Sequence, residues 1–390
     1  MYNQRGDIVD FDFADVPVID GHIHLKHPER IGGIVAVMEA VPYARTNLLS
    51  MPHPDQINQN PAVIRFKAHY PDRAYISGGL DYTQVLEGCG CARRGAGENL
   101  AKQIDTLKAI GFDGLKMHEG EPQERKWIGL ALDAPEYEGM WARLEALGMP
   151  IVLHQAAPEE FWDAERIPEW ARSYAGGCFY GDGSYPLKED LYEEVERVLE
   201  RHPRLRLILA HLYFLSADLE RASRFLDAHP SVCFDLTPGL EMLNNLSRTP
   251  DAAREFLIAY QDRLIYGTDI TSADLEAGDE FGMKASLAKA WVVRAFLERD
   301  DVFAPPEEIG FWLYPGLDGF QGLDLPRDVL DKIYCVNLER LYGPAPAPLD
   351  REAALVELER LAAALDARAG GAGGENPARR VAAELKVPGT

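Results

Sequence analysis

Residues 16–24 read V-P-V-I-D-G-H-I-H and combine a strand signal with two closely spaced histidines. The apolar run 16–19 is typical of a short buried strand, and the D-G pair after it marks its end. Because side chains two positions apart point the same way on an extended segment, His22 and His24 would face one point just past the strand's carboxyl end. That arrangement suits a divalent metal, although His-x-His alone is a weak signal.

The composition of the 390-residue chain is that of a globular protein, with 46% hydrophobic residues. No window approaches the ~18 consecutive apolar residues of a membrane span, and the N-terminus lacks the basic-then-apolar run of a secretory signal. The formal net charge of −23 would repel nucleic-acid phosphates and anionic membranes. The five cysteines are scattered, so we expect reduced thiols. These features predict a cytoplasmic enzyme that acts on a small molecule, with no nucleic-acid and no membrane partner.

Strand-like and helical segments alternate along most of the chain, at roughly the ~30-residue spacing of βα units. The strand-like segments are residues 16–19, 46–51, 74–80, 112–117, 149–153, 205–210, 231–236 and 263–267. The clearest helical segments are residues 100–110, 137–147, 188–201, 218–228, 251–260, 283–297 and 328–342. Eight such units favour an α/β fold of the (β/α)8 TIM-barrel type over an open doubly wound sheet. No glycine-rich phosphate loop follows any strand, which also disfavours a nucleotide-binding sheet.

The amino-acid composition changes after Gly343. Residues 344–348 read P-A-P-A-P, residues 350–368 form an Ala/Leu/Glu-rich helical segment, and G-G-A-G-G follows. We therefore assign residues 1–343 to the barrel and 344–390 to a linker and C-terminal helical extension. We expect this extension to be frayed or packed on a neighbouring subunit, because it carries no candidate catalytic group. A homo-oligomer is the corresponding expectation for the whole protein.

Residues that bind metals or move protons gather at the carboxyl ends of the predicted strands, where barrel enzymes carry their chemistry. In chain order they are His22, His24, Lys116, His154, His211 and Asp269. Neutral imidazoles of three histidines and one carboxylate form a mixed shell for Zn²⁺ or Mn²⁺, with zinc the first choice. We predict that this shell consists of His22, His24, His154 and Asp269.

A metal in that shell would lower the pKa of a bound water toward ~7 and supply hydroxide at neutral pH. Asp269 is placed to take the proton of the water and pass it to a leaving group. His211 would polarise the substrate oxygen, act as a general acid or bind a second metal. Asp269 and His211 are therefore the predicted catalytic residues.

The order His-x-His, Lys, His, His, Asp at successive strand ends resembles the amidohydrolase superfamily, from about Val16 to Tyr342. The words I-D-G-H-I-H, V-L-H-Q, L-A-H, Y-G-T-D and N-L-E-R-L-Y-G are most similar to its amidohydrolase-2 branch. That branch includes metal-dependent hydrolases, non-oxidative decarboxylases and hydratases of unsaturated or aromatic carboxylic acids. By resemblance to its decarboxylases, a one-metal site is implied, in which His211 polarises the substrate or acts as the acid.

Lys116, in G-L-K-M-H-E-G, leaves alternatives open. A protonated ammonium group has no lone pair for a metal. In the two-metal branches of the superfamily, a lysine after the fourth strand becomes a carbamate that bridges the ions, and Lys116 stands in the corresponding place. The alternatives are a cationic Lys116 that binds a substrate carboxylate, or Glu119 as the acidic ligand.

Four further residues are candidates for substrate binding. Arg125 carries a planar guanidinium group that can bind both oxygens of a carboxylate, although a solvated charge on a loop is an equally good interpretation. Trp162 and Tyr180 would wall a pocket, although aromatic residues over a barrel more often pack. Glu241 follows the seventh strand and would make a polar contact with the substrate.

The leading functional hypothesis is a metal-dependent hydrolase of a small ester, lactone or amide that carries a carboxylate. The alternative within enzymes is a decarboxylase or hydratase that uses the same shell to stabilise negative charge on the substrate. A barrel that keeps the metal site only as a binding module is a third hypothesis, and it is weakened because no ligand is missing.

Overall fold

The computed structural model describes residues 13, 15–87, 91–173, 177–276, 279–369 and 376–387. Its centre is a parallel nine-stranded sheet in the order β10-β9-β8-β7-β6-β5-β2-β1-β11. The strands are β1 (Ile19–His24), β2 (Arg45–Leu49), β5 (Ala74–Gly78), β6 (Gly114–Gly120), β7 (Ile151–Gln155), β8 (Leu207–Leu209), β9 (Cys233–Asp235), β10 (Leu264–Ile265) and β11 (Ile270–Thr271). Two short antiparallel hairpins join β3 (Pro52–His53) to β4 (Ile57–Asn58) and β12 (Val302–Phe303) to β13 (Phe320–Gln321).

The sheet closes on itself through the segment that contains β10 and β11. β10 pairs with β9 at one end of this segment, and β11 pairs with β1 at the other. Between these pairings, Gly21 N donates to the carbonyl of Tyr266 at 2.9 Å, and Asp269 N donates to the carbonyl of His22 at 3.0 Å. β10 and β11 thus act as one eighth strand. The predicted (β/α)8 barrel is confirmed.

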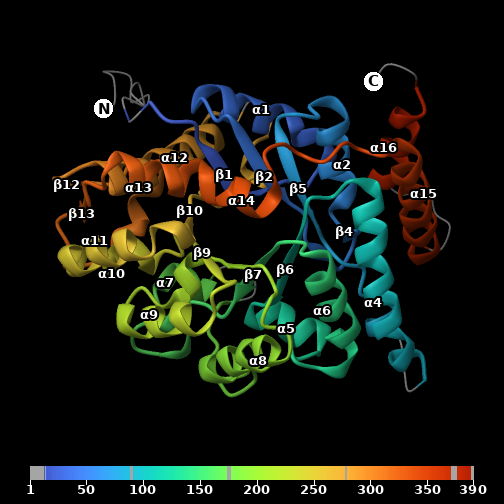
Figure 1. Cartoon of the computed structure of the whole chain (residues 1–390), viewed down its shortest axis with the longest axis horizontal. Coiled ribbons are helices and arrows are strands. Elements are labelled where there is room, and N and C mark those ends of the chain that lie inside the picture. Colours follow the sequence, from blue (N-terminus) through green and yellow to red (C-terminus); the bar gives the residue numbers. More distant parts are fainter. Residues whose placement is uncertain are drawn as a thin grey trace.

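Helices surround the strands, as Figure 1 shows. They are α1 (Ile31–Ala40), α2 (Asn60–His69), α3 (Thr83–Glu87), α4 (Cys91–Ile110), α5 (Pro122–Ile128), α6 (Pro135–Leu147), α7 (Glu169–Ser173), α8 (Lys188–Arg201), α9 (Leu219–Ala228), α10 (Glu241–Arg248), α11 (Pro250–Ala259), α12 (Glu280–Glu298), α13 (Arg327–Asp331), α14 (Asn337–Tyr342), α15 (Arg351–Arg368) and α16 (Pro377–Leu385). No helix in the described ranges has the length and apolar character that crossing a membrane requires.

The first strand begins later than the sequence predicts. β1 runs from Ile19 to His24, so the two histidines lie within the strand and not beyond it. Its register against β2 shifts between Asp20 and Ile23. The Asp20 carboxylate accepts hydrogen bonds from His22 N at 3.0 Å and from the Thr268 hydroxyl at 2.6 Å. These bonds stabilise the irregularity and fix the backbone that carries His22.

An apolar cluster takes one residue from each of seven strands, and Leu338 of α14 joins it. The strand residues are Ile19, Leu49, Tyr75, Val152, Ile208, Cys233 and Ile265. β6 provides Lys116 instead, in register with Val152 and fully buried. A lysine in such surroundings is unusual, because burial of an ammonium group is costly without a partner.

The C-terminal helices pack on the barrel of their own chain, α15 beside α4 and α16 beside α2 (Figure 1). Arg360 of α15 pairs with Asp81 at 2.9 Å, and Glu384 of α16 pairs with Arg65 at 2.7 Å. The described residues of this extension are therefore not frayed, and its contact with a neighbouring subunit stays a prediction. Homo-oligomerisation stays a prediction.

Candidate metal centre

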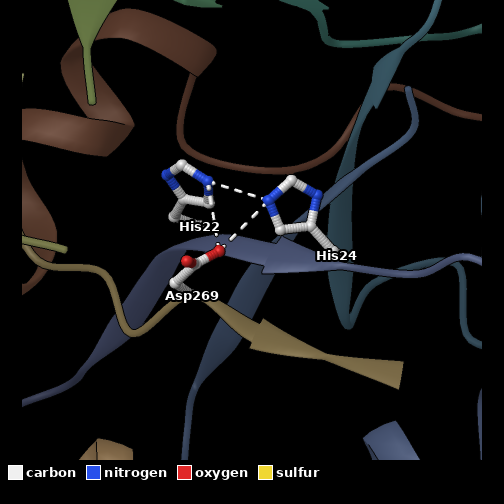
Figure 2. Close-up of side chains that lie close together, drawn as sticks. All are labelled: His22, His24 and Asp269. Carbon is white, nitrogen blue, oxygen red and sulfur yellow. Dashed lines mark hydrogen bonds and ion pairs between the residues drawn. The ribbon is translucent and has the colours of Figure 1, made fainter. Parts of the chain in front are cut away.

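His22 and His24 of β1 and Asp269, between β10 and β11, converge at the carboxyl ends of the strands (Figure 2). We call these three residues the metal triad. The Nε2 atoms of His22 and His24 lie 3.1 Å apart. Asp269 Oδ1 lies 3.2 Å from His24 Nε2 and 3.8 Å from His22 Nε2. A tetrahedral cation about 2.1 Å from each donor separates the donors by roughly 3.4 Å, so these distances fit one shared ion.

The backbone places Asp269 opposite the two histidines. Its φ of +56° is a left-handed conformation, and its carbonyl accepts a hydrogen bond from Lys289 Nζ at 3.1 Å. Gly267 allows the close approach to β1, because a Cβ there would lie 2.4 Å from Thr237 Oγ1 and 3.0 Å from His22 Cβ. The glycine of the Y-G-T-D motif, Gly267, is thus required for close packing against His22.

The protonation states of His24 and Asp269 also suit a cation. Burial lowers the pKa of His24 well below its ordinary value, so its imidazole is neutral at pH 7. Burial alone would raise the pKa of Asp269, but the His24 hydrogen bond and the nearby His22 outweigh it and hold this pKa well below the ordinary value. His24 Nδ1 is buried and has no hydrogen-bond partner in the described structure. Imidazole nitrogens and a carboxylate oxygen are donors that Zn²⁺ and Mn²⁺ accept, so the residues fit the implied metal.

Asp235, the last residue of β9, supports the triad and was missed by the sequence analysis. Its Oδ2 lies 2.8 Å from His22 Nδ1, and its Oδ1 accepts hydrogen bonds from the backbone N–H groups of His211 at 2.8 Å and Thr237 at 3.1 Å. Burial would raise the pKa of Asp235, but His22 and His211 outweigh it and keep this pKa below its ordinary value. Its position at a strand end, in C-F-D-L, was the available signal.

His154 and His211 contact each other and lie beside the triad. His211 Nε2 lies 3.2 Å from His154 Nδ1, and the His211 and His22 rings are 5.6 Å apart between centroids. His211 Nδ1 faces the Thr237 carbonyl at 3.1 Å, and His154 Nε2 faces the Ala156 carbonyl at 3.1 Å, so each of these nitrogens must donate. The two remaining lone pairs face each other, an arrangement that a shared proton or a cation stabilises.

His154 is thus placed next to His211 and not within the metal triad, so its role as a ligand stays a prediction. Burial lowers the pKa of His154 well below its ordinary value and lowers that of His211 to about 4. Both rings are therefore available as neutral bases at pH 7.

His211 also begins a strained turn, which extends to Phe214. The four φ angles from His211 to Phe214 are +60°, +52°, +57° and +51°, all left-handed. Such a conformation costs roughly 1–2 kcal/mol per residue and clusters at functional sites. The Tyr192 hydroxyl stabilises the turn from α8 by donating to the carbonyls of Tyr213 at 3.0 Å and Phe214 at 3.3 Å.

Lys116 reaches the triad, whereas Glu119 does not. Lys116 Nζ lies 3.4 Å from His22 Nε2, and burial lowers the pKa of this lysine to about 8. Glu119 Oε1 accepts a hydrogen bond from the Tyr82 hydroxyl at 2.6 Å, and burial raises the pKa of this carboxyl to about 7. Carbamylation of Lys116 and metal binding by Glu119 stay predictions.

Three of the four substrate-binding candidates already have partners within the fold. Arg125 Nη2 pairs with Glu194 Oε1 at 3.0 Å and links α5 to α8. Trp162 Nε1 donates to the carbonyl of Pro186 at 3.1 Å, and its ring packs against Tyr180. The buried Tyr180 hydroxyl donates to Glu121.

Glu241 is the candidate that lies beside the site. It is the first residue of α10 and is buried, and neither of its carboxyl oxygens has a hydrogen-bond partner in the described part of the chain. A Cβ built on Gly239 would lie 2.9 Å from His211 Cβ and 3.1 Å from Glu241 Oε2, so the carboxyl is close to His211. Burial raises the pKa of Glu241 to about 8.

Comparison with solved structures finds barrels of similar extent and low identity. A putative 2-pyrone-4,6-dicarboxylic acid hydrolase from Pseudomonas putida is 11% identical, with coverage of 85% of this chain and 98% of that chain and a TM-score of 0.47. The 4-oxalomesaconate hydratase from Rhodopseudomonas palustris is 11% identical, with coverage of 90% and 99% and a TM-score of 0.46. A dihydroxybenzoic acid decarboxylase from a Polaromonas species, solved with bound manganese, is 14% identical, with coverage of 84% and 97% and a TM-score of 0.46.

These three neighbours are named for three different reactions, and their likeness to this chain concerns the fold alone. No curated protein matches the sequence. The family comparison is decisive, because the model of one family covers most of the chain, including every residue of the site. That model is Amidohydro_2, described as amidohydrolase, and since it matches residues 19–344, the protein belongs to the amidohydrolase-2 family.

Proposed function

We propose that the protein is a metal-dependent hydrolase that cleaves a small ester, lactone or amide bearing a carboxylate. The observation that carries this proposal is the metal triad, in which two imidazole nitrogens and one carboxylate oxygen lie 3.1 to 3.8 Å apart. A divalent cation held there, Zn²⁺ or Mn²⁺, would lower the pKa of a coordinated water toward ~7 and polarise a substrate carbonyl.

Asp269 of the triad and the neighbouring His211 would supply the proton transfers. The side chain of Asp269 is 38% exposed, so its carboxylate can accept a proton from water and pass it to a leaving group. The Thr237 carbonyl holds the His211 proton on Nδ1, so Nε2 presents a lone pair. His211 would therefore begin as a base and become a donor only after it has taken up a proton.

Lys116 provides the positive charge that a substrate carboxylate requires. Its Nζ lies 3.4 Å from His22 Nε2 and is fully buried, so a carboxylate bound there would gain more than at an exposed lysine. In this role Lys116 is a protonated ammonium group, and the carbamate is the alternative state of the same side chain.

The test is an assay of protein loaded with Zn²⁺ or Mn²⁺ against a panel of small carboxylate-bearing esters, lactones and amides. We expect release of acid that disappears when the metal is removed by a chelator and returns when it is added back. Release of CO₂ from aromatic or unsaturated acids without any hydrolysis would replace the proposal with a decarboxylase. Hydration of such acids would replace it with a hydratase.

A further inference from the structure

We infer that Asp235 is a positioning residue that holds His22 in the tautomer that binds the metal and, with the same carboxylate, anchors the turn that carries His211. The inference rests on the proposed metal-dependent function and deepens it. Asp235 lies on β9, which is separated from β1 by the segment containing β10 and β11. Its carboxylate therefore joins two non-adjacent strands at the mouth of the barrel.

Asp235 determines which nitrogen of His22 carries the proton. A carboxylate accepts hydrogen bonds and cannot donate them, so the 2.8 Å contact with Asp235 Oδ2 places the His22 proton on Nδ1. The Nε2 atom then carries a lone pair, and this is the atom 3.1 Å from His24 Nε2 and 3.8 Å from Asp269 Oδ1. The other tautomer would direct an N–H at the place of the cation. A hydrogen bond from the second ring nitrogen to a carboxylate also orients a ligating histidine and makes it more basic.

Asp235 also stabilises the left-handed turn that begins at His211. Asp235 Oδ1 accepts from the N–H of His211, where the turn begins, and from the N–H of Thr237, whose carbonyl in turn accepts from His211 Nδ1. Both the backbone and the ring of His211 are thus tied to one short segment that Asp235 organises. Asp235 is fully buried, so these bonds do not compete with water.

An Asp235→Asn variant separates the effect of Asp235 on the His22 proton from its effect on the left-handed turn. The two backbone N–H groups that face Oδ1 require an acceptor there, so the amide oxygen takes that position and preserves the turn. The amide NH₂ then faces His22 Nδ1 and donates to it, which moves the His22 proton to Nε2 and removes the lone pair from the metal triad. An Asp235→Ala variant loses both sets of bonds.

The test measures metal affinity and tautomer, independently of activity. We expect Asp235→Asn to weaken Zn²⁺ and Mn²⁺ binding about 10- to 100-fold in competition with a chelator of known affinity. Nitrogen NMR of the metal-free protein should show His22 protonated on Nδ1 in the wild type and on Nε2 in Asp235→Asn, with the His22 signals assigned from their absence in His22→Gln. The His211 signals should move in Asp235→Ala and stay in place in Asp235→Asn.

Asp113→Asn is the matched control. Asp113 is also a buried carboxylate that accepts backbone N–H groups, from Ile76 at 2.9 Å and Ala347 at 2.6 Å, but it pairs with Lys67 away from the triad. We expect this variant to lose stability while its metal affinity and His22 tautomer stay unchanged.

Wild-type metal affinity in Asp235→Asn, or a wild-type His22 protonated on Nε2, would overturn the inference. The second measurement needs no variant, so it remains decisive if Asp235→Asn does not fold. If the wild-type protein binds neither metal, the proposed function fails, whereas the tautomer in the metal-free protein still decides the role of Asp235.

Discussion

At the scale of single residues, the proposed role of His22 as a ligand depends on Asp235, whose carboxylate lies 2.8 Å from Nδ1 and leaves Nε2 to the triad. Asp269 provides the only carboxylate of the triad, so the proposal gives it two roles, as a metal ligand and as the base. Asp269→Asn keeps the shape of the side chain and removes its basicity. We expect kcat to fall by at least about 10²- to 10⁴-fold, the contribution of a positioned general base, because the variant also loses the anionic ligand of the triad. Steady-state kinetics on the substrate found in the panel would measure the loss.

His22→Ala should abolish turnover by removing a ligand, while the fold survives because the apolar clusters of the barrel do not include His22. Metal content and circular dichroism would check both parts. His229→Ala is the control, since His229 pairs with Glu196 at 2.8 Å at the end of α9. Full activity in His22→Ala would end the assignment of the triad.

Glu241 gives a pH dependence whose sign follows from its burial. The pKa of this carboxyl is raised from 4.5 to about 8, so the folded protein keeps a proton that the unfolded chain releases. The free energy of unfolding should therefore contain a contribution that falls as pH rises from about 4.5 through 8. Glu241→Gln removes this contribution. We expect the variant to gain stability relative to the wild type between pH 5 and pH 8, measured by urea unfolding at both values.

Glu220→Gln is the control for that measurement, because Glu220 is highly exposed on α9. It should leave the pH dependence of unfolding unchanged. An equal difference between the wild type and Glu241→Gln at both pH values would show that Glu241 is ionised throughout.

The residues that sequence could identify are those whose type is rare at a strand end. The His-x-His pair stands out in this way, whereas Asp269 was identified from the Y-G-T-D motif, and three-dimensional proximity then joins them. Asp235 could not be assigned, because an aspartate at a strand end acquires its meaning from His22, 213 positions away. The placement of His154 next to His211 depends equally on which carbonyl each ring faces, and that is not encoded locally.

At the scale of elements, Arg125 forms an ion pair that joins α5 to α8, which gives it a structural role. The Glu194 side chain is almost fully buried, pairs with Arg125 and also accepts the N–H of Leu132 at 2.9 Å. Arg125→Met would leave this carboxylate without its cation. We expect the free energy of unfolding to fall by about 1–3 kcal/mol, with KM unchanged. Denaturant unfolding and kinetics on the same samples would test this.

Arg143→Met provides the comparison, since Arg143 pairs with Asp105 on an exposed surface and should contribute little. A rise in KM for Arg125→Met without loss of stability would instead support the interpretation that Arg125 binds the substrate carboxylate.

The long helices could be predicted because an apolar stripe at helical spacing needs only local information. α8 begins at Lys188 and ends at Arg201, as expected, and α6 ends at Leu147 before Gly148, whose φ of +58° suits a C-cap. The short α5 and α10 were not predicted, because so few residues give no periodic signal. β1 extends to His24, beyond the end that the sequence predicts, because the Asp20 side chain accepts hydrogen bonds from His22 N and the Thr268 hydroxyl and so stabilises the irregular strand.

At the scale of the whole molecule, closure of the barrel was predictable from the number of βα units, whereas the surface on which the C-terminal extension packs was not. The Ala/Leu/Glu-rich composition of α15 predicts a helix, but not the surface on which it packs. In the structure α15 packs on α4, and α16 packs on α2. The extension is thus part of the same hydrophobic body as the barrel.

Two substitutions on α15 test this packing without shortening the chain. Leu358 is fully buried, whereas Val356, two positions before it, is 66% exposed. Leu358→Glu would bury an unpaired carboxylate against the barrel, so we expect the midpoint of thermal unfolding to fall by several degrees. Val356→Glu adds the same charge to the same helix and should leave the midpoint nearly unchanged. Since the triad lies at the strand ends and not under α15, metal affinity below the unfolding transition should be equal in both variants. Equal midpoints for the two variants would mean that α15 contributes little to the folded body in solution.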